Sequence, residues 1–271
     1  MKLYNKFTKF KSIFKLSVIY RFSPVKIFRA IKEIIRFIND FTLFDNQRKQ
    51  STYKFPYGNL NPCMGERDRD GINSKEYFYQ DFHVAKRILE NKPEKHVDIG
   101  SRFDGFITHL CLFREVEVFD IRPLTVTLPN LKFIQADMME SISKSFLDYA
   151  DSISCLHALE HFGLGRYGDP IDYDGHLKGL DNIYRILRKG GKFYLSVPIG
   201  EDRIEFNAHR VFSLGYLYAL FEDKYKINNF SYIDNTGPLG NFHENIFVFA
   251  HDINNNFGIV QGCGIFEMTK L

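Results

Sequence analysis

The fold class of this chain follows from one segment, Val97-Asp98-Ile99-Gly100-Ser101-Arg102-Phe103-Asp104-Gly105. The segment leaves an apolar run, turns at Gly100 and continues into a helix-compatible stretch. In an open α/β sheet the ligand lies outside the carboxyl ends of the strands, where glycine lets the backbone approach it and the following helix N-terminus attracts negative charge. The segment therefore predicts a nucleotide-type ligand at this turn, and a tight structural turn is the alternative.

Short apolar runs recur along the chain, and most of the segments between them are compatible with helices. Strands that alternate with helices form parallel sheets through right-handed crossovers. The sequence thus predicts an α/β sheet. Its expected parallel strands are His96–Ile99, Val116–Phe119, Leu131–Ile134, Ser152–Leu156 and Lys192–Val197.

The pattern changes after the fifth strand. Tyr225–Ile233 and Asn245–Ala250 have strand composition, and a Gly/Pro/Asn-rich loop without an obvious helix joins them. A short connection of this kind joins antiparallel strands. We therefore expect an antiparallel end to the sheet.

Two helices of this body can be located by their apolar spacing. The first starts at Ser74 and stops at Pro93, with Phe78, Phe82, Ala85 and Leu89 on one face. The second covers His176–Lys189 and ends in basic residues followed by two glycines, which is a typical C-terminal stop.

Acidic residues follow the second and third predicted strands. Asp120 ends the second strand about twenty residues after the glycine turn, where a carboxylate accepts hydrogen bonds from ribose hydroxyls. Asp137 comes just past the third strand, where it can accept from an adenine amino group while Met138 covers the ring. Together with the glycine turn, these acids favour a nucleoside ligand.

These positions resemble those of the S-adenosylmethionine (SAM)-dependent methyltransferases, from about Tyr77 to Ala250, and Leu159-Glu160-His161 after the fourth strand fits the same scheme. A closer resemblance is to the methyltransferase-like domain-of-unknown-function family 268. It is carried by Gln80-Asp81-Phe82, His96–Arg102, His157–Pro170, Phe206-Asn207-Ala208-His209-Arg210 and Gly262–Phe266.

The resemblance implies a seven-stranded Rossmann-like methyltransferase sheet with helices on both faces, and SAM as cofactor at the ends of the first three strands. The residues it assigns to SAM are Asp98, Gly100, Ser101, Arg102, Gly105, Asp120, Ile121, Asp137, Met138 and His157. The superfamily usually has Gly-x-Gly-x-Gly in the first loop, whereas Arg102 and Asp104 stand at its second and third positions here. Pairing of Arg102 with the methionine carboxylate of SAM would suit this departure; a surface arginine is the alternative.

The loop after the fourth strand supplies the candidate acid–base residues. We expect His161 to act as general base, with Glu160 as base or orienter and His209 as a further candidate, because a hydroxyl acceptor must lose its proton during attack. A purely structural role for these histidines is the alternative. His157–His161 also matches His-x-x-Glu-His, but that zinc pattern requires a helix, and Gly163, Gly165 and Gly168 follow it here.

An acidic cluster in the same loop could hold Mg²⁺ through oxygen ligands. It comprises Asp169, Asp172 and Asp174, next to His176. Most acidic loops are simply solvated, so we assign no metal.

The charge of the chain is distributed unevenly. Residues 1–50 hold 12 Lys/Arg against 3 Asp/Glu, a net charge of +9, and the remainder has a net charge of −6. Aromatic and Ile residues recur at helical spacings on either side of Pro24. We expect a basic amphipathic helical arm (1–50), a linker or lid (51–73) and a methyltransferase-like domain (74–271). The arm suits an acidic partner such as a lipid surface or nucleic acid, and a solvated basic helix is the alternative.

The remaining features bound the function. The four cysteines, Cys63, Cys111, Cys155 and Cys263, form neither a CxxC pair nor a disulfide framework, and no apolar run is long enough to span a bilayer, so we expect a cytoplasmic protein, with peripheral contact at the inner face of the membrane as an option. The body has no nucleic-acid footprint, and an oligomer is compatible with the sequence.

The predicted activity is methyl transfer to a small polar acceptor. Families of this kind are associated with surface-polysaccharide synthesis, which points by analogy to a sugar or nucleotide-sugar. A non-catalytic methyltransferase-like scaffold, associated with a membrane or a glycan-assembly complex, is the alternative, because the glycine loop is altered and the arm is basic. An enzyme using NAD is less favoured, since the first loop lacks Gly-x-Gly-x-x-Gly.

Overall fold

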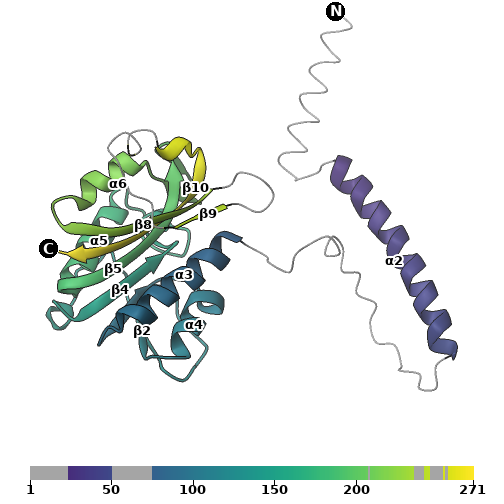
Figure 1. Ribbon diagram of the computed structural model, residues 1–271, viewed down its shortest axis with the longest axis horizontal. Helices are drawn as coiled ribbons and strands as arrows, with labels where there is room; N and C mark the ends of the chain where they lie inside the picture. Colours follow the sequence, from purple (N-terminus) through teal and green to yellow (C-terminus); the bar gives the residue numbers. More distant parts are fainter. Residues whose placement is uncertain (1–23, 51–74, 207, 235–240, 245–252, 254–255) are drawn as a thin grey trace, which may run out of the picture. The chain divides into compact units, whose positions relative to one another are not determined.

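The computed structural model describes residues 24–50, 75–206, 208–234, 241–244, 253 and 256–271 (Figure 1). The chain divides into two units, residues 1–73 and 74–271. The second unit contains all the strands of the described residues and every predicted site residue. We describe each unit by itself.

An eight-stranded sheet forms the centre of the second unit, in the order β3-β2-β1-β4-β5-β10-β8-β9. Strands β1 to β5 are parallel to one another, whereas β10 runs antiparallel to both β5 and β8. The strands are β1 His96–Ile99, β2 Val116–Asp120, β3 Leu131–Gln135, β4 Ala150–Leu156, β5 Leu187–Gly200, β8 Tyr225–Asp234, β9 Asn241–His243 and β10 Gln261–Lys270. A separate hairpin pairs β6 Arg203–Glu205 with β7 His209–Val211.

This arrangement confirms the predicted Rossmann-like methyltransferase sheet, which is mostly parallel and has an antiparallel end. The short edge strand β9 adds one strand to the expected seven. The antiparallel strand beside β5 is β10, which the sequence reasoning missed. The predicted strand Asn245–Ala250 lies outside the described residues.

Helices cover both faces of the sheet, and each face has its own apolar core (Figure 1). One core contains the apolar sides of α5 and α6, and the other contains those of α3 and α4. Successive strand residues point to opposite faces, so Val118 packs in the second core and Phe119 in the first. The helices of this unit are α3 Lys75–Asn91, α4 Thr108–Cys111, α5 Gly175–Ile186 and α6 Leu214–Phe221.

The predicted apolar face of α3 was correct at Ala85 and wrong at its other three positions. The structure buries Val84, Ala85 and Ile88, whereas Phe78 and Phe82 are exposed. The buried face also carries polar side chains that find hydrogen-bond partners, and hydropathy spacing alone therefore pointed to the other side of the helix.

The helix predicted over His176–Lys189 ends earlier, at Ile186. Leu187 already belongs to β5, where it is buried and pairs with Ala150 of β4. The glycines that were expected to stop the helix lie inside β5 instead, and Gly190 has a φ of +74°.

The first unit is described only over α2, Pro24–Gln50, which lies where the second helix of the arm was expected. Proline suits the first helical position, because its missing N–H has no intrahelical partner there. The first expected helix, residues 1–23, and the linker lie outside the described residues. In the part of the chain that the structure describes, no helix is both long and apolar enough to cross a lipid bilayer.

Candidate functional site

A cavity of about 290 Å³ opens at the carboxyl ends of β1, β2, β3 and β4. This is the edge where an open α/β sheet holds its ligand. The predicted residues that line it are Gly100, Arg102, Asp120, Ile121, Asp137, Met138, His157, Glu160, His161 and His209. Asp98, Ser101 and Gly105 do not line it.

Asp98 and Ser101 instead stabilise the glycine turn through buried hydrogen bonds. The Asp98 carboxylate accepts hydrogen bonds from the Ser101 backbone N–H (3.0 Å), the Ser101 hydroxyl (2.6 Å) and the Ser154 hydroxyl (2.5 Å), and burial raises the pKa of Asp98 to about 6. The Ser101 hydroxyl accepts from the Leu156 N–H at the end of β4 (3.0 Å). These bonds tie the turn after β1 to the end of β4, so both walls of the cavity are fixed relative to each other.

The two glycines of the first loop serve different contacts. Gly100 has a φ of +67°, in the left-handed region that favours glycine. A Cβ at this position would lie only 3.1 Å from the Ala158 Cβ, so the absence of a side chain keeps this part of the cavity open. A Cβ on Gly105 would approach the Asp81 carboxylate to 2.3 Å. Gly105 therefore allows the turn that precedes α4 to pack against α3.

Arg102 lines the cavity and stacks over a ring. Its guanidinium binds the Asp104 carboxylate through two hydrogen bonds of 3.0 Å and lies 4.5 Å from the centroid of Tyr77. Tyr77 also lines the cavity, whereas the Asp104 side chain is exposed. The arginine fork expected to receive a ligand carboxylate thus already has a carboxylate partner from its own loop.

Asp120 ends β2 inside the cavity and is paired with Arg122. The Asp120 Oδ1 atom accepts from the Arg122 N–H (2.8 Å) and Nε (3.0 Å), and Oδ2 accepts from the guanidinium (2.5 Å). The Arg122 guanidinium also lies 4.5 Å from the centroid of Tyr167. An ionised carboxylate has about four acceptor positions, so Arg122 leaves Asp120 limited capacity for a ligand.

The third strand end supplies an acid and an apolar cover. The Asp137 Oδ1 atom accepts from the Met139 N–H (2.8 Å), which fixes the side chain in a local turn. Met138 packs in the core formed with α5 and α6, and its carbonyl accepts a hydrogen bond from the Asn182 side chain (2.8 Å). Both Met138 and Met139 line the cavity, and they supply an apolar wall next to the Asp137 carboxylate.

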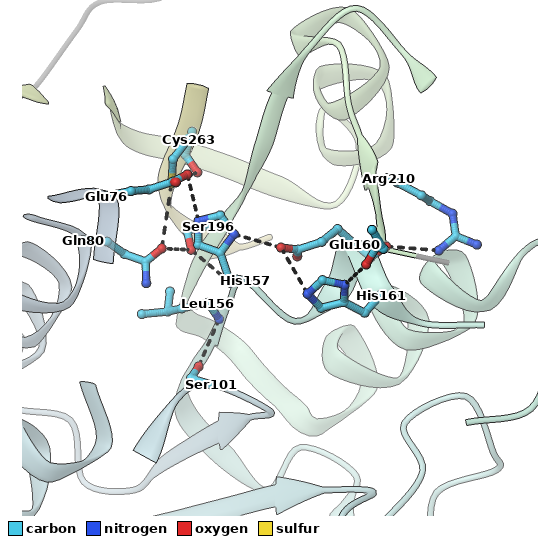
Figure 2. A network of polar contacts seen from close by, with 12 residues as sticks. Glu76, Gln80, Ser101, Leu156, His157, Glu160, His161, Ser196, Arg210 and Cys263 are labelled. Atoms are coloured by element: carbon cyan, nitrogen blue, oxygen red, sulfur yellow. Dashed lines mark hydrogen bonds and ion pairs between the residues drawn. The ribbon is translucent and has the colours of Figure 1, made fainter. Parts of the chain in front are cut away.

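A buried network of charged groups lies at the end of β4 (Figure 2). His157 sits between two carboxylates, with Nδ1 2.8 Å from Glu160 Oε1 and Nε2 3.2 Å from Glu76 Oε1. Burial opposes protonation of His157, but Cys263 and Glu160 beside the ring raise the pKa of His157 well above its ordinary value. Burial would raise the pKa of Glu76, yet the neighbouring His157 lowers that pKa overall.

His157 also has an unusual backbone conformation. Its φ is +49°, which is uncommon for a residue with a Cβ and persists where the surrounding structure holds it. Here its N–H donates to the Ser196 carbonyl (3.0 Å), and the Ser196 hydroxyl donates to Gln80 (2.5 Å). The ring is thereby turned away from the strand and into the space between α3 and the loop after β4.

His161 has a defined tautomer when neutral. Its Nδ1 lies 2.7 Å from the Ala208 carbonyl, which can only accept, so Nδ1 carries the proton and Nε2 carries the lone pair. Nε2 lies 3.7 Å from Glu160 Oε1. Burial lowers the pKa of His161, against the smaller raising effect of Glu160. His161 is therefore a neutral base near neutral pH.

The segment from Leu159 to Asp174 is held in shape by main-chain contacts. Leu159–His161 forms a single 3-10 turn, so the His-x-x-Glu-His pattern does not lie on a helix. The buried Arg210 guanidinium donates to the Phe162 carbonyl (2.6 Å) and the Tyr173 carbonyl (2.9 Å), which closes the loop across its base. His209, next in the chain, lines the cavity.

The acidic residues of this loop bind its own backbone. The Asp169 carboxylate accepts from the N–H groups of Gly163 (2.8 Å), Gly165 (3.0 Å) and Tyr167 (3.1 Å). Asp172 pairs with Lys178. Within the described ranges, the donor atoms near enough to share a metal ion come from another group, Glu76, His157 and Cys263.

Comparison with protein families assigns part of the chain. Residues 129–239 match the model described as "Caenorhabditis protein of unknown function, DUF268". This segment is similar to the DUF268 family. The DUF268 segment runs from just before β3 to just after β8 and includes the network around Glu160 and the loop closed by Arg210. No curated protein matches the chain.

Solved structures with similar folds include two methyltransferases and a cyclase. The N-methyltransferase NodS from Bradyrhizobium japonicum WM9, in complex with S-adenosyl-L-homocysteine, has a TM-score of 0.48 and 11% identity over 79% of this chain and 93% of that chain. A putative sarcosine dimethylglycine methyltransferase from Galdieria sulphuraria has a TM-score of 0.48 and 13% identity over 71% and 85%. The [4+2]-cyclase SpnF has a TM-score of 0.46 and 11% identity over 69% and 80%.

Several residues of the site had no role assigned from the sequence. Arg122 stands two residues after Asp120, and this spacing could have indicated the ion pair. Glu76 and Cys263 are far from His157 in the sequence, and only the fold brings them together. Gln80, Arg210 and Cys263 did lie in stretches that carry the family resemblance, which was the available signal for them.

Proposed function

We propose that this chain is a SAM-dependent methyltransferase that acts on a small polar acceptor. The observation that carries the proposal is the cavity at the ends of β1 to β4, where a left-handed glycine turn, two strand-end carboxylates and a neutral histidine base face one space. The strand order, with β10 antiparallel beside β5, supports the same activity. S-adenosylmethionine, when bound, supplies a methyl group on a positively charged sulfur.

The residues around the cavity fit this cofactor. Gly100 leaves room that a Cβ would occupy, and Asp120 retains an acceptor position for a ribose hydroxyl. Asp137 stands beside the apolar wall of Met138 and Met139, which suits a planar base with an amino group. Arg102 would exchange the Asp104 carboxylate for the carboxylate of the methionine moiety, since the bidentate geometry is the same.

His161 is the proposed general base. Its Nδ1–H donates to Ala208, and the Nε2 lone pair is available to take a proton from an acceptor hydroxyl or amine. The Arg166 guanidinium donates to the same carbonyl (2.8 Å), which fixes that carbonyl and with it the ring. Glu160, held by His157, stands next to Nε2 and would stabilise the positive charge that His161 gains.

The acceptor in this proposal is a sugar or nucleotide-sugar in polysaccharide synthesis. The support from this molecule is the polar part of the cavity lining, where Arg166, Asp169 and His209 lie with Tyr167. Arginine, carboxylate and imidazole groups match the hydroxyls of a sugar, and aromatic rings pack against its apolar face. The link to surface polysaccharides rests on analogy with related families.

Calorimetric titration of the purified full chain with SAM, and with S-adenosylhomocysteine, tests the cofactor. We expect micromolar affinity, which corresponds to about −8 kcal/mol. Incubation with SAM and a panel of nucleotide-sugars, followed by mass spectrometry, tests the acceptor. No heat and no thermal shift at millimolar SAM would reject the proposal, because the cavity then does not bind the cofactor.

The alternative is a non-catalytic scaffold with a methyltransferase-like fold. The pairing of Arg102 with Asp104 and of Arg122 with Asp120 favours it, because both ligand-binding charges are satisfied within the chain. A protein that binds no SAM but co-purifies with glycan-assembly proteins would support this alternative. The calorimetric titration separates the two functions.

The arm carries a further part of the proposal, peripheral binding to the inner face of the membrane. Along α2 apolar residues recur every three to four positions, from Ile27 through Ile31 and Ile34 to Ile38, and residues 1–50 carry a net charge of +9. Each basic residue near an anionic surface contributes about 1 kcal/mol. Full-length protein should sediment with phosphatidylserine vesicles at low salt, and the 51–271 truncation should not. If the full-length protein does not sediment with such vesicles, the arm does not bind membranes and instead packs against protein.

A further inference from the structure

One cluster of donor groups has no task in the proposed reaction. Glu76 in the first turn of α3, His157 at the end of β4 and Cys263 near the start of β10 meet next to the cavity (Figure 2). One carboxylate oxygen, one imidazole nitrogen and one sulfur all lie within 4.8 Å of one another. Three elements that are distant in the sequence thus converge on a single point.

The imidazole of His157 is aimed into this cluster. Its Nδ1 pairs with Glu160 Oε1 at 2.8 Å, so the other ring nitrogen, Nε2, faces Glu76 and Cys263. The His157 side chain is 6% exposed, and its Nε2 atom is buried without a hydrogen-bond partner. The 3.2 Å contact with Glu76 Oε1 does not have the geometry of a hydrogen bond. A buried polar atom without a partner is costly and requires an explanation.

A carboxylate on the far nitrogen is the usual partner of a metal-binding histidine. Histidines that ligate a metal nearly always donate their second N–H to a carboxylate or carbonyl, which orients the ring. Glu160 provides that contact, and its backbone carbonyl accepts from the buried Arg210 guanidinium (3.4 Å). The orienting residue is therefore held in place from a separate element, β7.

Cys263 completes the donor set. It is fully buried on β10, and its sulfur lies 3.8 Å from Gln80 Oε1, 3.9 Å from the Gly264 carbonyl and within 4.8 Å of the donor atoms of Glu76 and His157. Nitrogen, sulfur and oxygen donors together suit Zn²⁺, whereas Mg²⁺ and Ca²⁺ prefer oxygen alone. A thiolate and a carboxylate together neutralise the charge of one divalent cation.

We propose that Glu76, His157 and Cys263 bind one Zn²⁺ ion, with Glu160 orienting His157. On binding, the ion takes the place of the proton on the Cys263 thiol and of any proton on His157 Nε2, and these protons go to solvent. Because Glu76 and His157 line the cavity, the ion borders the space assigned to the acceptor. Three protein ligands leave one tetrahedral position, which water or a heteroatom of the acceptor fills.

Cobalt substitution tests the proposal without SAM or an acceptor, so its result is independent of the proposed function. Full-length protein, stripped with a chelator, is titrated with Co²⁺ and then with Zn²⁺. We expect one equivalent to bind, with a thiolate-to-cobalt charge-transfer band in the near ultraviolet and visible bands of tetrahedral cobalt, both lost when Zn²⁺ displaces Co²⁺. Elemental analysis of the untreated protein should find up to one zinc per chain.

Variants identify the ligands. Cys263→Ser should abolish the charge-transfer band, and Cys111→Ser, a cysteine outside the cluster, should keep it. Glu160→Gln should weaken zinc binding 10- to 100-fold without removing the band. Glu76→Gln, which alters a residue in the first turn of a helix and should fold, should weaken zinc binding at least tenfold. A folded wild-type protein without the band, or a band that persists in Cys263→Ser, would overturn the proposal and leave the cluster as an ion triad centred on His157.

Discussion

Asp120, at the end of β2, and Glu160, after β4, line the same cavity, and the two carboxylates are held in different ways. The Asp120 carboxylate binds Arg122, whose side chain is 43% exposed, through three hydrogen bonds within two residues of sequence. The Glu160 side chain is 1% exposed and pairs with His157, while its second oxygen is buried without a partner. Asp120 is itself buried, but its partner Arg122 is close in sequence and reaches solvent, whereas the groups around Glu160 are buried and include residues from distant segments.

The difference indicates how each side can take part in binding. An exposed arginine can move aside for a ligand at little cost, because water satisfies its donors. The groups around Glu160 cannot rearrange without leaving buried charges unpaired, which costs several kcal/mol. We therefore expect the β2 side to adapt to the cofactor, and the β4 side to present a preformed set of groups to the acceptor or to a metal ion.

The largest expected effect concerns the preformed side. His161→Ala should lower turnover about 10²- to 10⁴-fold, because it removes the general base. The affinity for SAM should stay within about twofold, since the lost interaction belongs to proton transfer. Initial rates with an identified acceptor, together with calorimetry, measure both quantities. Full activity in this variant and loss of activity in His209→Ala would move the base to β7.

The pH dependence of turnover sharpens the same assignment. Because burial lowers the pKa of His161 below 6.5, the base stays unprotonated through neutral pH, and turnover should fall only as pH drops below that value. Among the charged neighbours, Glu160 raises the pKa of His161, whereas Arg166 and His157 lower it. In His161→Ala, the residual turnover should no longer fall as the pH drops below 6.5, because the titrating base is gone.

A second prediction concerns His96, the first residue of β1, which is buried in uncharged form. His96 is fully buried, with Nδ1 2.7 Å from the Ser152 hydroxyl and Nε2 3.0 Å from the Ser154 hydroxyl, and burial lowers the pKa of His96 to about 3. The unfolded chain therefore binds more protons between about pH 3 and 6.5, and His96 contributes stability that is lost as pH falls through this window.

Chemical unfolding at pH 7.5 and pH 5 measures this contribution. The destabilisation caused by His96→Gln should shrink by about 2 kcal/mol on going to pH 5, since the wild-type protein loses about 1.4 kcal/mol per pH unit below 6.5 from this group. The raised pKa of Asp98 acts in the opposite direction in both proteins and largely cancels in the difference. His109→Gln, at an exposed histidine, is the matched control.

The smallest expected effect concerns the adaptable side. Asp120→Ala should weaken SAM binding at least tenfold, about 1.4 kcal/mol, because a charged hydrogen bond to ribose is lost. Arg122→Ala should keep or strengthen SAM binding, because it frees the Asp120 acceptors. Calorimetry on the two variants compares them directly. Equal losses in both would mean that Arg122 itself contacts the ligand, and the contrast between the two sides would then be wrong.

The sequence predicted those parts of the fold that have local signals. The first five strands were located because each is an apolar run followed by a turn, and the Gly100 turn was placed correctly between β1 and the next helical segment. Strand β10 was missed because Gly262 and Gly264 interrupt its apolar pattern, and glycine inside a strand usually marks a loop or a close approach. Here both glycines fit against neighbouring strands.

The candidate site could be predicted only in part, because some of its residues have local signals in the sequence and others do not. The strand-end acids and the His157–His161 run lie in predictable places, and they do line one cavity. Nothing local shows that Glu76 of α3 and Cys263 of β10 lie beside His157, because that contact depends on the register of three separate elements. Arg210 lies in a stretch that carries the family resemblance, yet the four backbone carbonyls that accept its hydrogen bonds are brought together only in the folded loop.

Strand β10 lies between β5 and β8, although it follows both of them in the sequence. Both β5 and β8 are therefore synthesised before the strand that joins them, and the edges that face β10 stay unpaired until β10 is made. The Cys263 sulfur arrives with that last strand, so the cluster around His157 is completed only when the middle of the sheet closes. Chaperone demand during synthesis should thus centre on β5 and β8, and a nascent chain halted before β10 should expose them to aggregation.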